Sequence, residues 1–186
     1  MTKSSDKELV AKSSPALVAF YLSQRADSEG RMIDDIWSWN YDKLERVHDY
    51  VQWLFPLKDK SGYNPNALIL DDEVVEAFRT DPLLKTRLQK SFKIMLRFYG
   101  LKCNEGNINN IQITKSDQYQ DRKRRWIEPL NHNYLRIARI LKCLTTLGLE
   151  NYAQAFFKCL DNIYSEDSQK IGSDTYAFWK RAIEMS

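Results

Sequence analysis

The chain has 186 residues, of which 28 are basic and 25 are acidic, so its formal net charge is only +3. This length predicts one domain, with a core large enough to fold without disulfides or metals. Hydrophobic residues make up 43% of the chain, which excludes an intrinsically disordered protein. The balanced charge does not by itself imply nucleic-acid binding.

The N-terminal segment 1–14 is polar and charged, without the apolar core of a signal peptide, and we expect it to be flexible. The rest of the chain, 15–186, is the predicted domain. No apolar run in the sequence approaches the ~20 residues that a membrane-spanning helix needs. These features predict a cytoplasmic protein without a transmembrane segment.

Apolar residues recur at helical spacing along most of the chain. The longest such run places Leu84, Leu88 and Phe92 on one face between Asp81 and Gly100. These runs predict an all-α fold, a compact single-domain bundle of about six to eight helices. In chain order, the spacing predicts a short helix from Leu17 and further helices over 42–55, 71–78, 81–100, 132–147, 149–163 and 174–183.

Prolines and glycines mark the ends of several predicted helices. The pairs Ser14–Pro15 and Asp81–Pro82 each look like an N-cap followed by a first-turn proline. Pro56 is expected to end the helix over 42–55. Gly100 and Gly148 follow periodic runs, where a left-handed C-cap is expected.

The segment 102–130 is predicted to be one long polar loop, and such loops are usually functional or flexible. Within it, residues 107–114 alternate as a strand does. The run "DRKRRW", Asp121 to Trp126, puts four consecutive bases before a tryptophan. Such a run can grip a nucleic-acid backbone, although a solvated loop is the better interpretation. Nucleic-acid binding is therefore kept as an alternative function.

Motifs for common enzyme and metal chemistry are absent from the sequence, which has no P-loop, GxGxxG, HExxH, CxxC or GxSxG. Cys103, Cys143 and Cys159 lack metal-ligand spacing and are expected to be free, packed thiols. We therefore predict no cofactor, no metal and no enzymatic activity. The weaker alternative is an enzyme in which His48 and His132 converge with a carboxylate.

The stretch "YDKLERVHDYVQWLFPL", residues 41–57, combines a predicted core face with an adjacent polar face. Most of its large aromatic side chains, and those just upstream, are expected in the core. The polar side chains are harder to bury, because each then needs a hydrogen-bond partner. They either hold the fold together or contact a ligand. The candidate ligand-binding residues here are Trp37, Trp39, Glu45, His48, Gln52 and Trp53.

The segment "PLNHNYLRIARIL", residues 129–141, predicts a helix that begins at His132, with Asn131 or Asn133 as N-cap. The spacing of His132, Arg136 and Arg139 places them on one helix face. A helix N-terminus beside two arginines can hold a carboxylate or a phosphate. The alternative is a solvated basic face. The candidate ligand-binding residues here are His132, Asn133, Arg136 and Arg139.

Several strings in this chain resemble the conserved domain of the opioid growth factor receptor family. The resemblance extends over roughly 16–183 and rests on "IDDIWSWNYDKLERVHDYVQWLFPL", "YNPNALIL", "MLRFYGL", "HNYLRIARILKCLTTLGLENY" and "SDTYAFWKRAI". It implies an all-helical domain, binding of the pentapeptide Met-enkephalin and a negative effect on cell proliferation. Animal members associate with nuclei and carry long repeat-containing tails, whereas this chain looks like the lone-domain form of microbes and fungi.

Residues and resemblance together predict a binding module for a short peptide or a small anionic ligand. The amine of such a peptide is expected at Asp34, Asp35 or Asp49, and its aromatic ring near the tryptophans. Its carboxylate is expected on the helix face of His132, Arg136 and Arg139. Charge complementarity also suggests that the acids of 34–49 pair with the arginines of this face.

Overall fold

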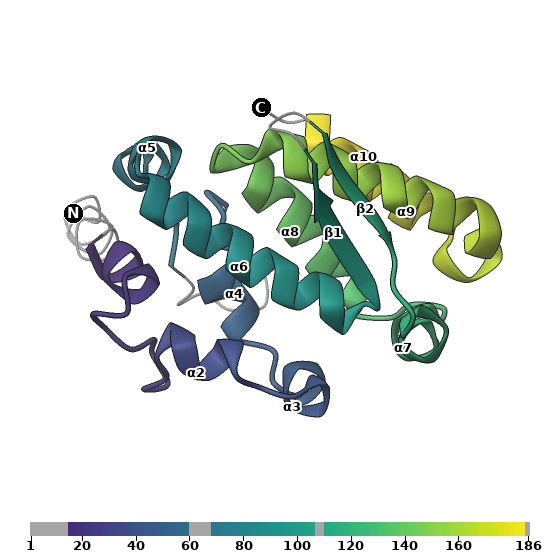
Figure 1. The fold of residues 1–186 in the computed structure, drawn as a ribbon, viewed down its shortest axis with the longest axis horizontal. Coiled ribbons are helices and arrows are strands. Elements are labelled where there is room, and N and C mark those ends of the chain that lie inside the picture. The colour runs from purple at the N-terminus through teal and green to yellow at the C-terminus, as the bar shows by residue number, and fades with distance from the viewer. Residues whose placement is uncertain (1–14, 60–67, 107–109, 185–186) are drawn as a thin grey trace, which may run out of the picture. The chain divides into compact units, whose positions relative to one another are not determined.

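The computed structural model describes residues 15–59, 68–106 and 110–184 (Figure 1). None of the helices in these ranges is long and apolar enough to cross a membrane. Residues 15–21 are helical. The elements that follow are α2 (Ile33–Trp37), α3 (Tyr41–Arg46), α4 (Tyr50–Leu54), α5 (Asp72–Thr80), α6 (Pro82–Phe98), β1 (Leu101–Glu105), β2 (Ile111–Lys115), α7 (Tyr119–Trp126), α8 (Asn133–Thr146), α9 (Glu150–Ile171) and α10 (Ser173–Glu184).

The all-α prediction holds only in part, because the fold is mostly helical but includes a small two-stranded sheet. The described ranges also contain more helices than the six to eight that periodicity predicted. The chain groups into two compact units, unit 1 (Met1–Ser91) and unit 2 (Phe92–Ser186), with the boundary inside α6. The single domain expected from the length stays a prediction.

Aromatic side chains build the core of unit 1. Tyr21 packs edge-on against Phe78 with 4.9 Å between ring centroids, and its hydroxyl donates to the carbonyl oxygen of Leu54. Phe20 packs against Trp53 with a centroid separation of 5.1 Å. These contacts join the helical residues 15–21 to α4 and α5.

The single helix predicted over 42–55 is wrong, because the chain forms α3 and α4 there. α3 ends at Arg46, and Val47 is extended with φ −87° and ψ 135°. α4 begins at Tyr50, whose hydroxyl donates to the carbonyl oxygen of Leu44 at 3.0 Å. The buried tyrosine thus satisfies an oxygen near the end of α3, where a helix leaves its last carbonyls without internal partners.

Other predicted helix ends are confirmed. Pro82 begins α6, and the Oδ1 atom of Asp81 accepts a hydrogen bond at 2.7 Å from the main-chain N–H two residues ahead. Gly100 and Gly148 have φ values of 79° and 87°, which belong to the left-handed region expected after a helix. The cap predicted at Ser14 lies outside the described residues.

The segment 102–130 is not a loop, because it contains most of a β-hairpin and the whole of α7. β1 and β2 pair antiparallel, with Leu101 opposite Lys115 and Glu105 opposite Ile111 (Figure 1). The strand-like alternation predicted from the sequence is confirmed for the part that forms β2. An antiparallel pair needs a partner strand, and periodicity did not reveal β1 because only its first residue is fully buried.

α7 forms where the run "DRKRRW" was predicted to lie in a loop. Trp126 at its end is buried and donates its indole N–H to the carbonyl oxygen of Tyr99 at 3.1 Å. The main-chain N–H of Ser116 donates to the carbonyl oxygen of Gly100 at 2.9 Å. Tertiary contacts with the end of α6 therefore stabilise a helix whose own sequence lacks an apolar period.

The helices α8, α9 and α10 pack against one another, and β2 lies against α9. Trp179 of α10 is buried and donates its indole N–H to the carbonyl oxygen of Tyr134 at 3.0 Å. All three cysteines are free, as predicted, and Cys143 and Cys159 are buried. Burial raises the pKa of the Cys159 thiol to about 11, so this side chain stays neutral and unreactive at physiological pH.

Gly100 is a position where the fold leaves no room for a side chain. Its φ is +79°, and a Cβ atom there would lie 2.8 Å from the Cα of Tyr119 and 2.9 Å from the Cβ of Arg122. We expect Gly100→Ala to lower the free energy of unfolding by about 2–5 kcal/mol, from backbone strain plus overpacking. Gly30→Ala is the control, because φ there is +77° and nothing lies within 4 Å of an added Cβ. Urea unfolding followed by circular dichroism measures both; equal losses would contradict the close packing of α7 on Gly100.

Leu130 is the converse of Gly100, because it already has a side chain at a position where the backbone favours glycine. Its φ is +59°, it is 99% exposed, and it follows Pro129 in a turn closed by Asn131 N–H donating to the carbonyl oxygen of Glu128. The third position of such turns favours glycine. We expect Leu130→Gly to raise the free energy of unfolding by about 0.5–1 kcal/mol. The half-exposed Leu135 in α8 is the control, because Leu135→Gly should lower the free energy of unfolding by about 1 kcal/mol. Thermal unfolding measures both variants, and midpoints that shift in the same direction would refute this account.

Candidate functional site

The residues of unit 1 that best combine exposure, charge and an aromatic ring lie around Trp37 at the end of α2. The guanidinium carbon of Arg87 lies 4.7 Å from the Trp37 ring centroid, and the Lys90 ammonium lies 4.0 Å from it. The indole N–H donates to the hydroxyl of buried Ser91 at 2.9 Å, which fixes the ring orientation. We call Asp34, Trp37, Arg87 and Lys90 the Trp37 platform.

Arg87 of the platform is held by neutral oxygens rather than by a close acid. Its Nε atom donates to the carbonyl oxygen of Tyr21, and its Nη2 atom donates to the hydroxyl of Ser23. The Ser23 hydroxyl donates in turn to Asp34 Oδ2, which lies 3.5 Å from Arg87 Nη2. That separation exceeds the ~2.7–2.9 Å of a charged hydrogen bond. Asp34 and Arg87 therefore form a loose ion pair bridged by the serine.

A second tryptophan, Trp39, also carries two cations. The Lys43 ammonium lies 4.4 Å and the Arg31 guanidinium carbon 5.6 Å from its ring centroid. Here the arginine is saturated, because it donates to both Oδ atoms of Asp49 at 3.0 and 3.1 Å and to Asp27 at 2.7 Å. Burial lowers the pKa of the Arg31 guanidinium, and the hydrogen bonds to Asp49 and Asp27 raise it by more. We call Asp27, Arg31, Trp39, Lys43 and Asp49 the Trp39 cluster.

The Trp39 cluster has the features of a structural ion-pair network. The Asp27 side chain is fully buried, and its Oδ1 atom accepts from the main-chain N–H groups of Glu29 and Arg31, both at 2.9 Å. A buried carboxylate needs such partners, since an unpaired buried charge is costly. The cluster therefore fixes the loop before α2 to the start of α4, and Asp49 finds its basic partner inside unit 1.

The three tryptophan side chains of the predicted site are neither fully buried nor fully exposed. Trp37, Trp39 and Trp53 are half-buried, and each has a ring contact with a cation or another aromatic side chain. Trp53 packs on Phe20 in the core of unit 1. Only Trp37 combines its exposed part with an arginine that is not saturated by acids.

The polar face predicted on the 42–55 helix does not form as one face, because the helix is broken at Val47. Glu45 belongs to α3 and is half-buried, whereas Gln52 belongs to α4 and is also half-buried. His48 lies between the two helices and is exposed. These three residues thus come from three different local environments, and their role in ligand binding stays a prediction.

The predicted site at the start of α8 divides between surface and core. His132 is the exposed N-cap residue, whereas Arg136 is only 6% exposed and Asn133 is buried. The Oδ1 atom of Asn131, just before the N-cap, accepts from the main-chain N–H of Asn133 at 2.9 Å. Arg136 Nη1 donates to Asn133 Oδ1 at 3.3 Å.

Because exposure differs along the predicted face, His132 and Arg136 do not present one basic surface to solvent. Arg139, one turn further on, is half-buried. The burial of Arg136 favours a structural role for it. The assignment of His132, Asn133, Arg136 and Arg139 to a ligand site stays a prediction.

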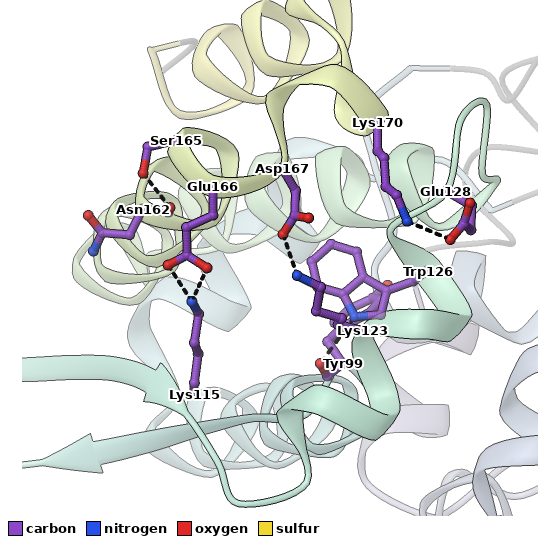
Figure 2. A network of polar contacts seen from close by, with 10 residues as sticks. All are labelled: Tyr99, Lys115, Lys123, Trp126, Glu128, Asn162, Ser165, Glu166, Asp167 and Lys170. Carbon is purple, nitrogen blue, oxygen red and sulfur yellow. Dashed lines mark hydrogen bonds and ion pairs between the residues drawn. The ribbon is translucent and has the colours of Figure 1, made fainter.

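The basic run of α7 is largely used within unit 2. Arg122 donates through Nε to the carbonyl oxygen of Phe98 at 2.7 Å. The Lys123 ammonium lies 2.7 Å from Asp167 Oδ2, and Figure 2 shows this ion pair. Asp167 is the residue that interrupts α9, with φ −124° and ψ 27°. Arg124 and Arg125 are exposed. Two of the four bases therefore stabilise the packing of α7 on α6 and α9.

Sequence reasoning missed Arg87, Lys90 and Ser23, although it identified Trp37 and Asp34. The two cations lie on α6, more than 45 residues along the chain from Trp37. The available signal was their spacing of three residues, with Arg87 at the edge of the buried face formed by Leu84 and Leu88 and Lys90 exposed beyond it. Within the described ranges, no cluster of His, Cys, Asp and Glu side chains is arranged to hold a metal ion.

The chain is similar to a group of named proteins over most of its length. The opioid growth factor receptor (OGFr) conserved region matches residues 12–185. The mouse opioid growth factor receptor is 40% identical over 126 residues, which are 66% of this chain and 19% of the receptor. The human receptor is 37% identical over 139 residues, 73% of this chain and 20% of the receptor. Opioid growth factor receptor-like protein 1 of Xenopus tropicalis is 37% identical over 133 residues, 70% of this chain and 25% of that protein.

The chain thus spans about a fifth to a quarter of the length of these relatives. No solved structure matches it. The conserved region nevertheless covers almost all of the sequence, including both units and the Trp37 platform. The chain therefore belongs to the opioid growth factor receptor family.

Proposed function

We propose that this chain is a non-catalytic binding domain for a short peptide and that the Trp37 platform contacts the peptide. The observation that carries the proposal is the half-exposed indole of Trp37, with two cations over its ring and Asp34 beside them. A short peptide offers the complementary groups: a charged carboxylate, a charged amine and apolar or aromatic side chains. Aromatic rings and arginine are enriched where proteins bind peptides and other proteins.

The relatives suggest the first peptide to test as a ligand. The mouse and human relatives are named as receptors for an opioid growth factor, and the resemblance noted in the sequence implies that the peptide is Met-enkephalin. Because this chain covers only part of each relative, peptide binding by the conserved region is itself part of the proposal. Growth regulation, implied for the animal proteins, would depend on this binding step.

The Trp37 platform is better suited to contact a ligand than the predicted site at the start of α8. Its Lys90 is exposed and Arg87 is 21% exposed, so a ligand can reach both cations from solvent. Arg136, in contrast, is buried. Nucleic-acid binding is less supported, because Arg122 and Lys123 of the basic run already have partners in unit 2.

Lys90 provides the sharpest test of the platform, because it is exposed and its removal leaves the core intact. Isothermal titration calorimetry should detect Met-enkephalin binding to the wild-type chain. We expect Lys90→Ala to weaken it by about 0.2–1 kcal/mol, up to roughly fivefold in Kd, because the lost contact is partly solvated. Lys180→Ala is the matched control, since Lys180 is an exposed lysine of α10 and carries the same charge change.

Two results would count against the proposal. Absence of heat at millimolar Met-enkephalin would remove this peptide as the ligand of the chain. Equal effects of Lys90→Ala and Lys180→Ala would show that only net charge matters, and the platform would then not be the contact surface.

A further inference from the structure

We infer that the Trp37 platform recognises a carboxylate and that Asp34 occupies Arg87 in place of that carboxylate when no ligand is bound. This inference deepens the proposed function and rests on it, because it names the chemical group that the same surface selects. It assigns Arg87 as the residue that binds the ligand carboxylate and Asp34 as an internal competitor.

The hydrogen bonds of Arg87 support its part in this inference. A guanidinium has five N–H donors in a planar fork that matches a carboxylate. Arg87 uses Nε for the carbonyl oxygen of Tyr21 and Nη2 for Ser23. Within the part of the chain that the structure describes, no hydrogen bond from Nη1 is found. The side chain is thus fixed against Trp37 while donors remain for an incoming anion.

The Trp39 cluster shows what a satisfied arginine looks like in the same unit. Arg31 uses Nε, Nη1 and Nη2 on two carboxylates at 2.6–3.1 Å. Both arginines lie over a tryptophan, and their exposed fractions are similar, at 18% for Arg31 and 21% for Arg87. The difference is therefore the missing close carboxylate on Arg87 rather than its depth in the fold.

The hold of Asp34 on Arg87 is weak enough for a ligand to replace. Asp34 is 56% exposed, and its Oδ2 atom lies 3.5 Å from Arg87 Nη2. The link runs mainly through Ser23, a residue in the left-handed backbone region at φ 57°. Exposed ion pairs contribute little to stability because water screens both charges. A ligand carboxylate that bonds the fork directly would displace the acid into solvent.

The position of the fork also limits which carboxylates fit. A carboxylate on Arg87 would lie close to the Trp37 ring, because the guanidinium carbon is 4.7 Å from the ring centroid. The exposed Lys90 ammonium contacts the same indole and adds positive charge near it. An apolar group next to that carboxylate can cover the exposed part of the ring. The favoured ligand class is therefore a peptide C-terminus, or a similar carboxylate with an apolar neighbour.

The inference predicts that removing the charge of Asp34 tightens carboxylate binding. The probes are N-acetylmethionine, which has a free carboxylate, and N-acetylmethionine amide, which does not. Both are titrated into the full chain while the indole N–H resonance of Trp37 is followed by NMR, and the spectrum itself reports the fold of each variant. We expect Asp34→Asn to lower the Kd of the acid about two- to fivefold, with no change for the amide.

Asp174→Asn on α10 is the control, because Asp174 is exposed and the change in net charge is the same. It should leave the Kd of the acid unchanged. Arg87→Lys keeps the positive charge but removes the planar fork, so it should weaken the acid more than the amide.

The remaining outcomes overturn the inference. Weaker or unchanged acid binding in Asp34→Asn would mean that Asp34 does not compete with the ligand carboxylate for Arg87. If N-acetylmethionine shifts the Trp37 indole resonance in neither the wild-type chain nor Asp34→Asn, carboxylate recognition at Arg87 is excluded. Titrations with Met-enkephalin and with its C-terminal amide separate the two proposals. Equal affinities for the two peptides would reject carboxylate recognition, while peptide binding would stand. If neither peptide binds, peptide binding itself is rejected.

Discussion

In each unit, large buried aromatic side chains donate hydrogen bonds to main-chain oxygens near helix ends, and these bonds connect elements of the fold. Tyr21 and Tyr50 donate their hydroxyls to main-chain oxygens near the ends of α4 and α3. In unit 2, Trp126 donates its indole N–H to the oxygen of Tyr99, just past α6. Burying such groups without partners would cost several kcal/mol, and helix ends supply carbonyl oxygens that lack internal partners. The positions of aromatic side chains and of helix ends are therefore coupled.

This coupling explains which elements periodicity could predict. Caps and C-terminal glycines depend on local chemistry, so Asp81, Gly100 and Gly148 were identified from the sequence alone. The break between α3 and α4 depends on a contact from Tyr50 back to Leu44, which an apolar pattern does not encode. α7 also depends on contacts that an apolar pattern does not encode. It packs on Gly100, and its Lys123 pairs with Asp167 of α9.

The candidate site divides in the same way. Trp37 and Asp34 were identified because they stand in a short, unusual string of acids and tryptophans. Arg87 and Ser23 were not, because their significance lies in tertiary contacts across 11 to 66 residues of chain. The distinction between Arg87 and Arg31 was also beyond the sequence, since both are arginines near acids. Only the geometry shows that one is saturated and the other is not.

An internal competitor at Arg87 has a consequence for selectivity. A free anion gains one contact and must displace Asp34, so the net change in free energy is small, as for any partly exposed ion pair. A ligand that also covers the Trp37 ring adds apolar burial, which salt and competing anions do not screen. Asp34 therefore weakens the binding of simple anions, whereas carboxylates with an apolar neighbour still bind because they also cover the Trp37 ring. That arrangement discriminates a peptide end from the abundant small anions of a cell by the combination of groups rather than by charge alone.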